Sequence, residues 1–533
     1  MSYLRPIALS LLLVMSAVSS DEAAEKAETL GVVIDPGATE LGYRLQSNSD
    51  GPIRHLFTVL AASKAPESAR MVADLLCTIN KDAKLHVMVL GGAVEQARTN
   101  LRHLLLHDGI SSCQYPDWER RVSFTELRHD ATLWPNAFLA ANDAQGQPIL
   151  IRSRGYDREE LSLIPAGEEE ADAFQQAIQS LVPELRIIRA PFYFNDGDVR
   201  VGKRIVFIHA NTLLTEMLRR LVRASIKDRA GAEDDYCSSD DIAAMGVREY
   251  HQEWLDERSW EFLDCRFLTG RLSRQDLLAG YLAVRAEVDA FFARKLFVVD
   301  EDRLLHREYG ILVNPRGLRS LYDIEVEQIA YDLDVYFHAL PESPGGVMQV
   351  AVGSTKLLAD ALYGETPAAL ARAGIELFAR YEHALNGIDE KDVFPVAALG
   401  IDLADFNHKT FGQSLVGTDI GNAEAELNRL VRQLVEIGLR VIRAPMANAR
   451  SERRSWSIPG FRDSNRHLSY LNILVDGDED GPILLVPDYG IPVLERAARQ
   501  SYERAGFRVR FIRGMEVSVM GWGGLNCATL EIR

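Results

Sequence analysis

The sequence has little basic charge, few cysteines and only one long apolar run. Its 533 residues include 59 lysines and arginines against 77 acidic residues, for a formal net charge of −18. Proteins that bind nucleic acid neutralise phosphates with a basic face, so this balance argues against nucleic acid as a partner. With 47% hydrophobic and 26% charged residues, the chain has ample material for a folded core.

The single long apolar run lies near the start of the chain, from Pro6 to Val18. It follows Arg5 and precedes small residues and the charged stretch DEAAEKAE, the order found in secretory signal peptides. At about 13 residues it is shorter than the roughly 20 that a membrane-spanning helix needs. The sequence therefore predicts a signal peptide over residues 1–20, a mature protein that is secreted or periplasmic, and no membrane association after cleavage.

The five cysteines are Cys77, Cys113, Cys237, Cys265 and Cys527. In an exported chain an odd number leaves at least one cysteine unpaired. Spacing does not determine the connectivity, and a pair between Cys237 and Cys265 is one interpretation. The odd count allows Cys527 to be a free thiol.

Sequence motifs for common cofactors and metals are incomplete. The stretch VLGGAVEQ lacks the third glycine of a dinucleotide-binding motif. His103 and His107 are one helical turn apart but lack the acidic partner of zinc motifs. The stretch DGDEDG begins like a calcium loop, but Pro487 stands where the last carboxylate ligand would fall, so a polar hairpin turn is favoured. We expect no cofactor and no metal.

Two nearly identical heptapeptides indicate internal repetition. LRIIRAP spans residues 185–191 and LRVIRAP spans residues 439–445, and an amphipathic helical stretch precedes each. Strand-then-helix patterns also begin at Lys84 and Gly345. Repeats of this size suggest an α/β architecture built from copies of one module. The alternative is an ordinary α/β domain whose edge strands look alike.

A segment of different amino-acid composition interrupts these repeats. It begins with the polar stretch KDRAGAEDDYCSSDD and becomes helical where Ser273 and Asp276 form a capping box. We expect a helical insertion that is a lid, a dimer contact or scaffold; the sequence does not determine the oligomeric state. The predicted divisions are an N-terminal segment over residues 21–50, the first part of an α/β domain over 51–225, the insertion over 226–310, and the second part over 311–533.

The C-terminal stretch, residues 468–533, contains LSYLNILVD, GPILLVPDYG and GWGGLNCATLEIR. It resembles the end of guanidine-group-modifying enzymes of the pentein superfamily, nearest to agmatine deiminases and peptidylarginine deiminases. The resemblance implies a five-bladed α/β propeller of ββαβ modules, with a catalytic cysteine in a glycine-rich stretch. Cys527 falls at that position, and Ser469, Tyr470 and Asn472 match a Ser-Tyr-x-Asn element.

The resemblance implies three more site elements, and the first departs from the family pattern. A Trp-x-Arg-Asp element corresponds to the stretch around Trp134, where Asn136 and Ala137 stand in place of Arg and Asp. A methyl group cannot bind a guanidinium. Trp134 is either a core residue or a side chain that stacks on a cationic ligand.

The other two elements keep acids at altered positions. Where a Glu-Gly-Gly-Asn-like element is expected, Asn195 replaces the glutamate and Asp198 places an acid at the end of the loop. In place of His-x-Asp the chain has Asp332 and Asp334. If this stretch is a strand, His338 lies about 13 Å from Asp334, too far to replace the missing histidine.

Attack on a guanidinium carbon needs a thiolate, carboxylates that hold the planar cation, and an acid for the departing amine. The leading interpretation is a diverged guanidine-group hydrolase in which Cys527 attacks, Asp334 orients the substrate and Asp332 donates the proton, since neighbouring carboxylates raise one another's pKa. The substrate is then a small guanidino cation or an arginine within a peptide. The residues expected to contact it are Trp134, Asn195 and Asp198.

Several alternatives stay open from the sequence. An amidinotransferase differs only in the acceptor that resolves the covalent intermediate. A catalytically inactive pentein that binds a ligand or a protein partner would explain the altered elements. Cys527 could also be a small apolar residue of the last strand, and Asp332 and Asp334 could be solvated acids of a loop.

Overall fold

The structure is a computed structural model of the chain. The described residues are 43–49, 51–61, 65–91, 93–107, 118–128, 135, 137–154, 167–229, 267, 272–307, 310–313, 333–363, 420–448, 467–478, 480–515 and 524–533. The expected signal peptide and the cysteines at 113, 237 and 265 lie outside them.

Strands of the described residues form five sheets, and the fold is mixed α/β. With strands given in spatial order, the first sheet is β1 (Arg44–Leu45), β5 (Phe138–Asn142), β6 (Pro148–Arg152) and β7 (Arg186–Arg189). The second sheet is β10 (Lys295–Val299), β9 (Ile205–His209) and β8 (Val199–Val201). The third is β11 (Phe337–Leu340), β12 (Gln349–Ser354), β13 (Arg440–Asn448) and β14 (His467–Ser469). The last two are β15 (Leu474–Asp478), β16 (Gly481–Pro487) and β17 (Arg508–Ile512), then β18 (Thr529–Ile532), β2 (His55–Ala61), β3 (Lys84–Leu90) and β4 (Val122–Leu127).

All five sheets share one connection pattern. Each contains an antiparallel pair whose second strand also pairs in parallel with a later strand, and helix intervenes between the parallel strands. The intervening helices are α3 (Ala65–Thr78), α5 (Gly167–Leu181), α6 (Ala210–Arg229), α9 (Arg274–Phe292), α12 (Thr355–Tyr363), α15 (Ile420–Glu436) and α16 (Pro492–Arg504). α4 (Val94–His107) and η3 (Trp118–Arg120) lie between β3 and β4, which are also parallel. The remaining helices are α10 (Glu301–Leu305), α11 (Leu333–Tyr336) and η4 (Asp196–Asp198).

The expected repeats correspond to matching elements. The first heptapeptide contains β7, which follows α5. The second overlaps the first part of β13, which follows α15. The strand-then-helix patterns that begin at residues 84 and 345 form β3 with α4 and β12 with α12. These helices form because apolar residues recur at helical spacing; α15 buries Leu427, Leu430 and Leu434 against the strands.

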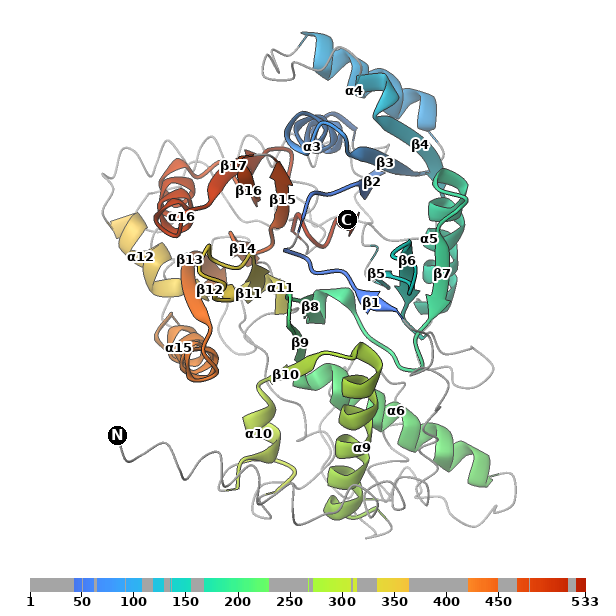
Figure 1. The fold of residues 1–533 in the computed structure, drawn as a ribbon, viewed down its shortest axis with the longest axis vertical. Coiled ribbons are helices and arrows are strands. Elements are labelled where there is room, and N and C mark those ends of the chain that lie inside the picture. Colours follow the sequence, from blue (N-terminus) through green and yellow to red (C-terminus); the bar gives the residue numbers. More distant parts are fainter. Residues whose placement is uncertain are drawn as a thin grey trace, which may run out of the picture.

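The chain ends inside the arrangement of sheets. Figure 1 shows the five sheets placed around the C-terminal end, with helices on the outer side. The last strand, β18, pairs with β2, the second strand of the described chain, so segments far apart in the sequence share one sheet. This pairing places the turn that precedes β18 among the inner edges of the other sheets, where the candidate site lies.

The segment expected as an insertion contributes to a sheet as well as helices. Ser273 and Asp276 form the expected capping box at the start of α9. Farther along, β10 lies parallel to β9 and extends its sheet. The stretch DGDEDG lies at the β15–β16 hairpin, in which Asp478 pairs with Gly481. Among the described residues, no helix has both the length and the apolar character to cross a bilayer.

Candidate active site

Cys527 lies in the turn that precedes β18, and its side chain is buried, at 4% exposed. The side chain of Asn472 holds this turn. Its Nδ2 donates to Sγ of Cys527 at 3.0 Å, and its Oδ1 accepts from the backbone N–H groups of Asn526 at 2.6 Å and Cys527 at 3.3 Å. Gly524 lets Asn472 approach, since a Cβ there would lie 2.4 Å from that Oδ1.

The thiol faces the carboxylate of Asp334. Oδ2 of Asp334 accepts hydrogen bonds from Sγ of Cys527 at 3.2 Å, from Nδ2 of Asn526 at 3.0 Å and from Nη2 of Arg200 at 2.6 Å. Among the described residues, the other oxygen, Oδ1, is buried and has no hydrogen-bond partner. One carboxylate oxygen therefore joins a thiol, an amide and a guanidinium.

Asp334 belongs to a helical turn, so the expectation of a strand here was wrong. α11 covers Leu333–Tyr336, and β11 begins only at Phe337. The backbone N–H of Leu333 donates to Oδ1 of Asp198 at 3.2 Å, which satisfies a first-turn donor and stabilises the turn. The separation of 13 Å between Asp334 and His338, which assumed a strand, does not apply.

His338 is fully enclosed at the start of β11 and is 1% exposed. Burial lowers the pKa of His338 well below its usual value, and the charge of Arg200 adds to this effect. The imidazole is therefore neutral at physiological pH.

Arg200 supplies the guanidinium from the middle of β8. Its side chain is fully buried. Besides Asp334, it donates through Nη1 to the carbonyl oxygens of Asp196 at 2.9 Å and Val199 at 2.8 Å, and lies 3.5 Å from Oδ1 of Asp196. Burial alone would lower the pKa of Arg200, but the carboxylates of Asp334 and Asp196 raise it above its usual value. The guanidinium is therefore a permanent cation beside Cys527.

The loop before β8 carries the polar residues expected to contact a substrate. Asn195 caps η4 by accepting the backbone N–H of Gly197 at 3.0 Å. Asp198 accepts from the hydroxyl of Thr212 at 3.1 Å and from α11. Burial raises the pKa of Asp198, and it raises the pKa of Asp196 to about 7. These hydrogen bonds of Asn195 and Asp198 hold the shape of the loop.

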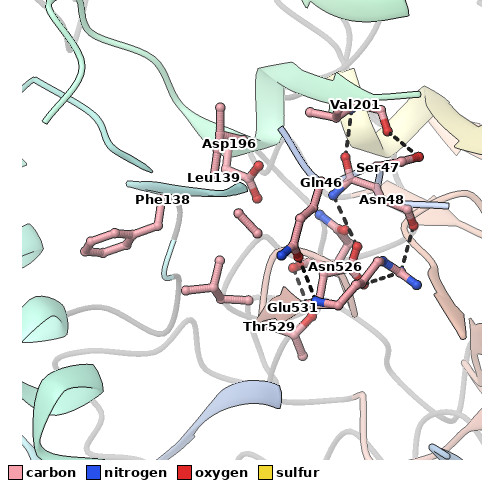
Figure 2. A pocket seen from close by; sticks show the side chains of 13 residues that line it. Gln46, Ser47, Asn48, Phe138, Leu139, Asp196, Val201, Asn526, Thr529 and Glu531 are labelled. Atoms are coloured by element: carbon pink, nitrogen blue, oxygen red, sulfur yellow. Dashed lines mark hydrogen bonds and ion pairs between the residues drawn. The ribbon is translucent and has the colours of Figure 1, made fainter. Parts of the chain in front are cut away.

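A small polar cavity adjoins the site. Its volume of about 20 Å³ is room for about one water molecule. Figure 2 shows polar side chains of Gln46, Asn526 and Glu531 around it. Asp196 also lines it, so the cavity lies beside two residues of the Arg200 and Asp334 cluster. Burial raises the pKa of Glu531, while the guanidinium of Arg533 acts in the opposite direction.

The structure brings two of the expected catalytic residues, Cys527 and Asp334, into contact. Trp134 and Asp332 lie outside the described residues. Sequence reasoning did not single out Arg200 or Asn526. The signal for Arg200 is an arginine between two valines that directly follows an acidic turn, and for Asn526 it is an amide next to the cysteine.

No protein-family model matches the chain, and no curated protein matches its sequence. Solved structures do match it. An agmatine deiminase of Enterococcus faecalis is 12% identical, with 94% of this chain and 98% of that one covered and a TM-score of 0.43. The agmatine deiminase of C. jejuni is 9% identical, with 92% and 96% covered and a TM-score of 0.44. An amidinotransferase from Microseira wollei is 10% identical, with 92% and 97% covered and a TM-score of 0.33. The chain is thus similar to solved structures of the guanidine-modifying enzymes that residues 468–533 resemble.

Proposed function

We propose that the chain is a five-bladed propeller of the pentein type with a deiminase-like thiol site. The propeller is supported by the common connection pattern of the five sheets and by their placement around the C-terminal end (Figure 1). The chemistry is supported by one observation above all. Sγ of Cys527 lies 3.2 Å from Oδ2 of Asp334, and the same oxygen already binds a guanidinium, that of Arg200.

The proposed reaction is hydrolysis of the guanidine group of an arginine-like substrate, either free or within a peptide. Asp334 orients the planar cation, and the Cys527 thiolate forms a bond to its central carbon. Asp332 gives its proton to the departing nitrogen, the carbon–nitrogen bond breaks, and ammonia leaves a thiouronium on Cys527. Water attacks the thiouronium carbon and gives a proton back to Asp332, the carbon–sulfur bond breaks, and a ureido product and the Cys527 thiolate result.

Asn472 and Asn526 support this chemistry by position. Asn472 fixes the thiol and the backbone of the turn, and Asn526 fixes the carboxylate of Asp334. Reacting groups held in a fixed geometry lower the entropic part of the barrier. Both amides are neutral, so they add no charge that would compete with a cationic substrate.

A second candidate is a catalytically inactive pentein that binds a ligand or a protein partner. The observation that favours it is the Arg200 guanidinium, which pairs with Asp334 inside the protein. If Arg200 stays paired with Asp334, no substrate guanidinium can bind beside the Cys527 thiol, and the protein then serves only for binding.

Ammonia release from arginine, agmatine and arginine-containing peptides separates the two candidates. We expect release by the wild type and none by Cys527→Ala. Arg499→Ala, on the outer helix α16 with its side chain 43% exposed, serves as the control for protein quality and keeps the wild-type rate. Release that persists in Cys527→Ala would contradict a cysteine mechanism. Silence of the folded wild type across all substrates would favour the inactive candidate.

We also propose that the protein acts outside the cytoplasm, after loss of residues 1–20. Cys77 is disulfide-bonded, which supports an oxidising compartment. N-terminal sequencing of the protein recovered from the medium or periplasm should begin near residue 21; a retained Met1 there would contradict the proposal.

A further inference from the structure

We infer that the guanidinium of Arg200 is an internal ligand that competes with any external guanidino group for Asp334. The inference rests on the proposed guanidine-binding role of Asp334. It adds that the described conformation is the occupied state of this site, with the occupant supplied by the chain itself. Arg200, fully buried in β8, thereby sets how tightly the site binds its ligand.

Hydrogen-bond capacity is the first reason. Oδ2 of Asp334 already accepts from Arg200, Asn526 and Cys527. A carboxylate that holds a guanidinium through paired bonds uses both oxygens. Only Oδ1 is without a partner among the described residues, so a second guanidinium cannot form the paired arrangement while Arg200 stays.

Charge is the second reason. Arg200 is a permanent cation, and it also lies against the carboxylate of Asp196. A second guanidinium at Oδ1 would place two like charges in a buried site, where water screens them poorly. The two carboxylates that pair with Arg200, those of Asp334 and Asp196, already face that cation.

Space is the third reason. The cavity beside Asp196 and Asn526 holds about one water molecule, at about 20 Å³. A guanidinium has four heavy atoms and does not fit there unless a side chain moves. Withdrawal of Arg200 would free a volume of the right shape, already lined by Asp334 and Asp196.

The consequence is a lowered apparent affinity. When a binding-competent state is only partly populated, the apparent dissociation constant rises by the inverse of that population. External ligand and the Arg200 pair therefore exclude one another. Removal of the arginine should tighten binding of a small guanidinium probe.

The experiment uses the full chain and methylguanidinium as the probe. We measure binding by calorimetry, together with alkylation of the Cys527 peptide by iodoacetamide, read by mass spectrometry. In Arg200→Ala we expect binding at least tenfold tighter than in the wild type, and probe-dependent protection of Cys527. Arg220→Ala is the matched control, because it also empties a buried arginine site, between Glu216 and Glu287. The control keeps Arg200, so the probe should affect Cys527 in it as it does in the wild type.

Equal affinity of the wild type and Arg200→Ala would overturn the inference, as would protection of Cys527 in Arg220→Ala as strong as in Arg200→Ala. If Arg200→Ala does not fold, Arg200→Val, a residue that suits a strand, also removes the charge and most of the side-chain length, and it too should bind more tightly than the wild type. These readouts do not need catalysis. If the wild type releases no ammonia but Arg200→Ala binds the probe more tightly, the hydrolase is rejected and the internal ligand is retained. If the wild type releases ammonia and both proteins bind the probe equally, the internal ligand is rejected and the hydrolase is retained.

Discussion

Nη2 of Arg200 lies 2.6 Å from Oδ2 of Asp334, and neither side chain is exposed to solvent. Burial of the two side chains removes the favourable hydration free energy of each charge. The attraction between the two charges offsets this loss only while both are present. The energetics of these two residues are therefore coupled, and either one changed alone leaves an uncompensated charge.

Asp334→Asn should lower the free energy of unfolding by about 3 to 5 kcal/mol, because it leaves a buried guanidinium facing an amide. Arg200→Met added to Asp334→Asn should restore part of this loss, with a coupling energy of about 1 to 3 kcal/mol. Urea unfolding of the wild type, both single variants and the double variant gives the values. Simple additivity of the two single effects would show that the ion pair is not the source.

Gly524→Ala should disturb the thiol without touching it. A Cβ at this position would lie 2.4 Å from Oδ1 of Asn472, so the amide that holds Cys527 must move. We expect a loss of about 1 to 3 kcal/mol in stability and loss of any Cys527-dependent hydrolysis. Gly345→Ala is the control, since its Cβ would approach Ser343 only to 3.8 Å. A Gly524→Ala protein that unfolds at the wild-type urea midpoint would refute this account.

Asp196→Asn should flatten the dependence of stability on pH. Burial raises the pKa of Asp196 from 3.8 to about 7, so between these values the folded protein holds a proton that the unfolded chain has lost. The stability that this proton gives is complete below about pH 4 and is lost as the pH rises through about 7, at no more than about 1.4 kcal/mol per pH unit.

The measurement is urea unfolding of the wild type and Asp196→Asn at steps from about pH 4 to 8. Asparagine does not titrate, so the stability of the wild type relative to the variant should decrease with increasing pH across this window. A constant difference would show that Asp196 has an ordinary pKa in the folded protein.

Arg533→Ala should destabilise the centre of the molecule. Its guanidinium, 5% exposed, donates to the carbonyl oxygens of Asn48 and Val475 and pairs with Glu531. Loss of these partners leaves buried acceptors unsatisfied, at about 1 to 3 kcal/mol. Arg508→Ala, which breaks a pair with Asp478 at a position 40% exposed, should cost less than about 1 kcal/mol. Equal urea midpoints for the two variants would contradict the difference.

The repeated modules are predictable from the sequence because local patterns encode them. The two heptapeptides contribute residues to β7 and β13. Each of these strands pairs in parallel with the preceding strand of its sheet, and each follows a helix with a regular apolar face. The capping box of α9 depends on two residues three positions apart, so it is also visible in the sequence. Such features need no knowledge of distant parts of the chain.

The site is less predictable, since its members are far apart. Cys527 and Asp334 are separated by 193 positions, and only the family resemblance suggests that they meet. Arg200 escapes notice because an arginine between two valines is typical of a strand with one solvent-facing side. In the structure both faces of β8 are buried, and the compensating acid lies 134 positions away.

The turn at Asp334 shows a different limit. The surrounding residues are apolar and suit a strand, and local propensity gives no reason for a helix. The helical turn of α11 depends on Asp198, whose carboxylate accepts the N–H of Leu333 from 135 positions away. A tertiary hydrogen bond thus determines the local conformation, which no local pattern could reveal.

The pairing of β18 with β2 also determines the order in which the molecule can assemble. The hydroxyl of Thr58 bonds to the carbonyl of Ala528, 470 positions later. During synthesis the edge of β2 therefore lacks its partner until residues 529–532 have left the ribosome. Contacts so distant in sequence slow folding and leave an open strand edge exposed to aggregation. The thiol of Cys527 becomes enclosed only at this last step, so its protection from chemical modification reports directly on completed folding.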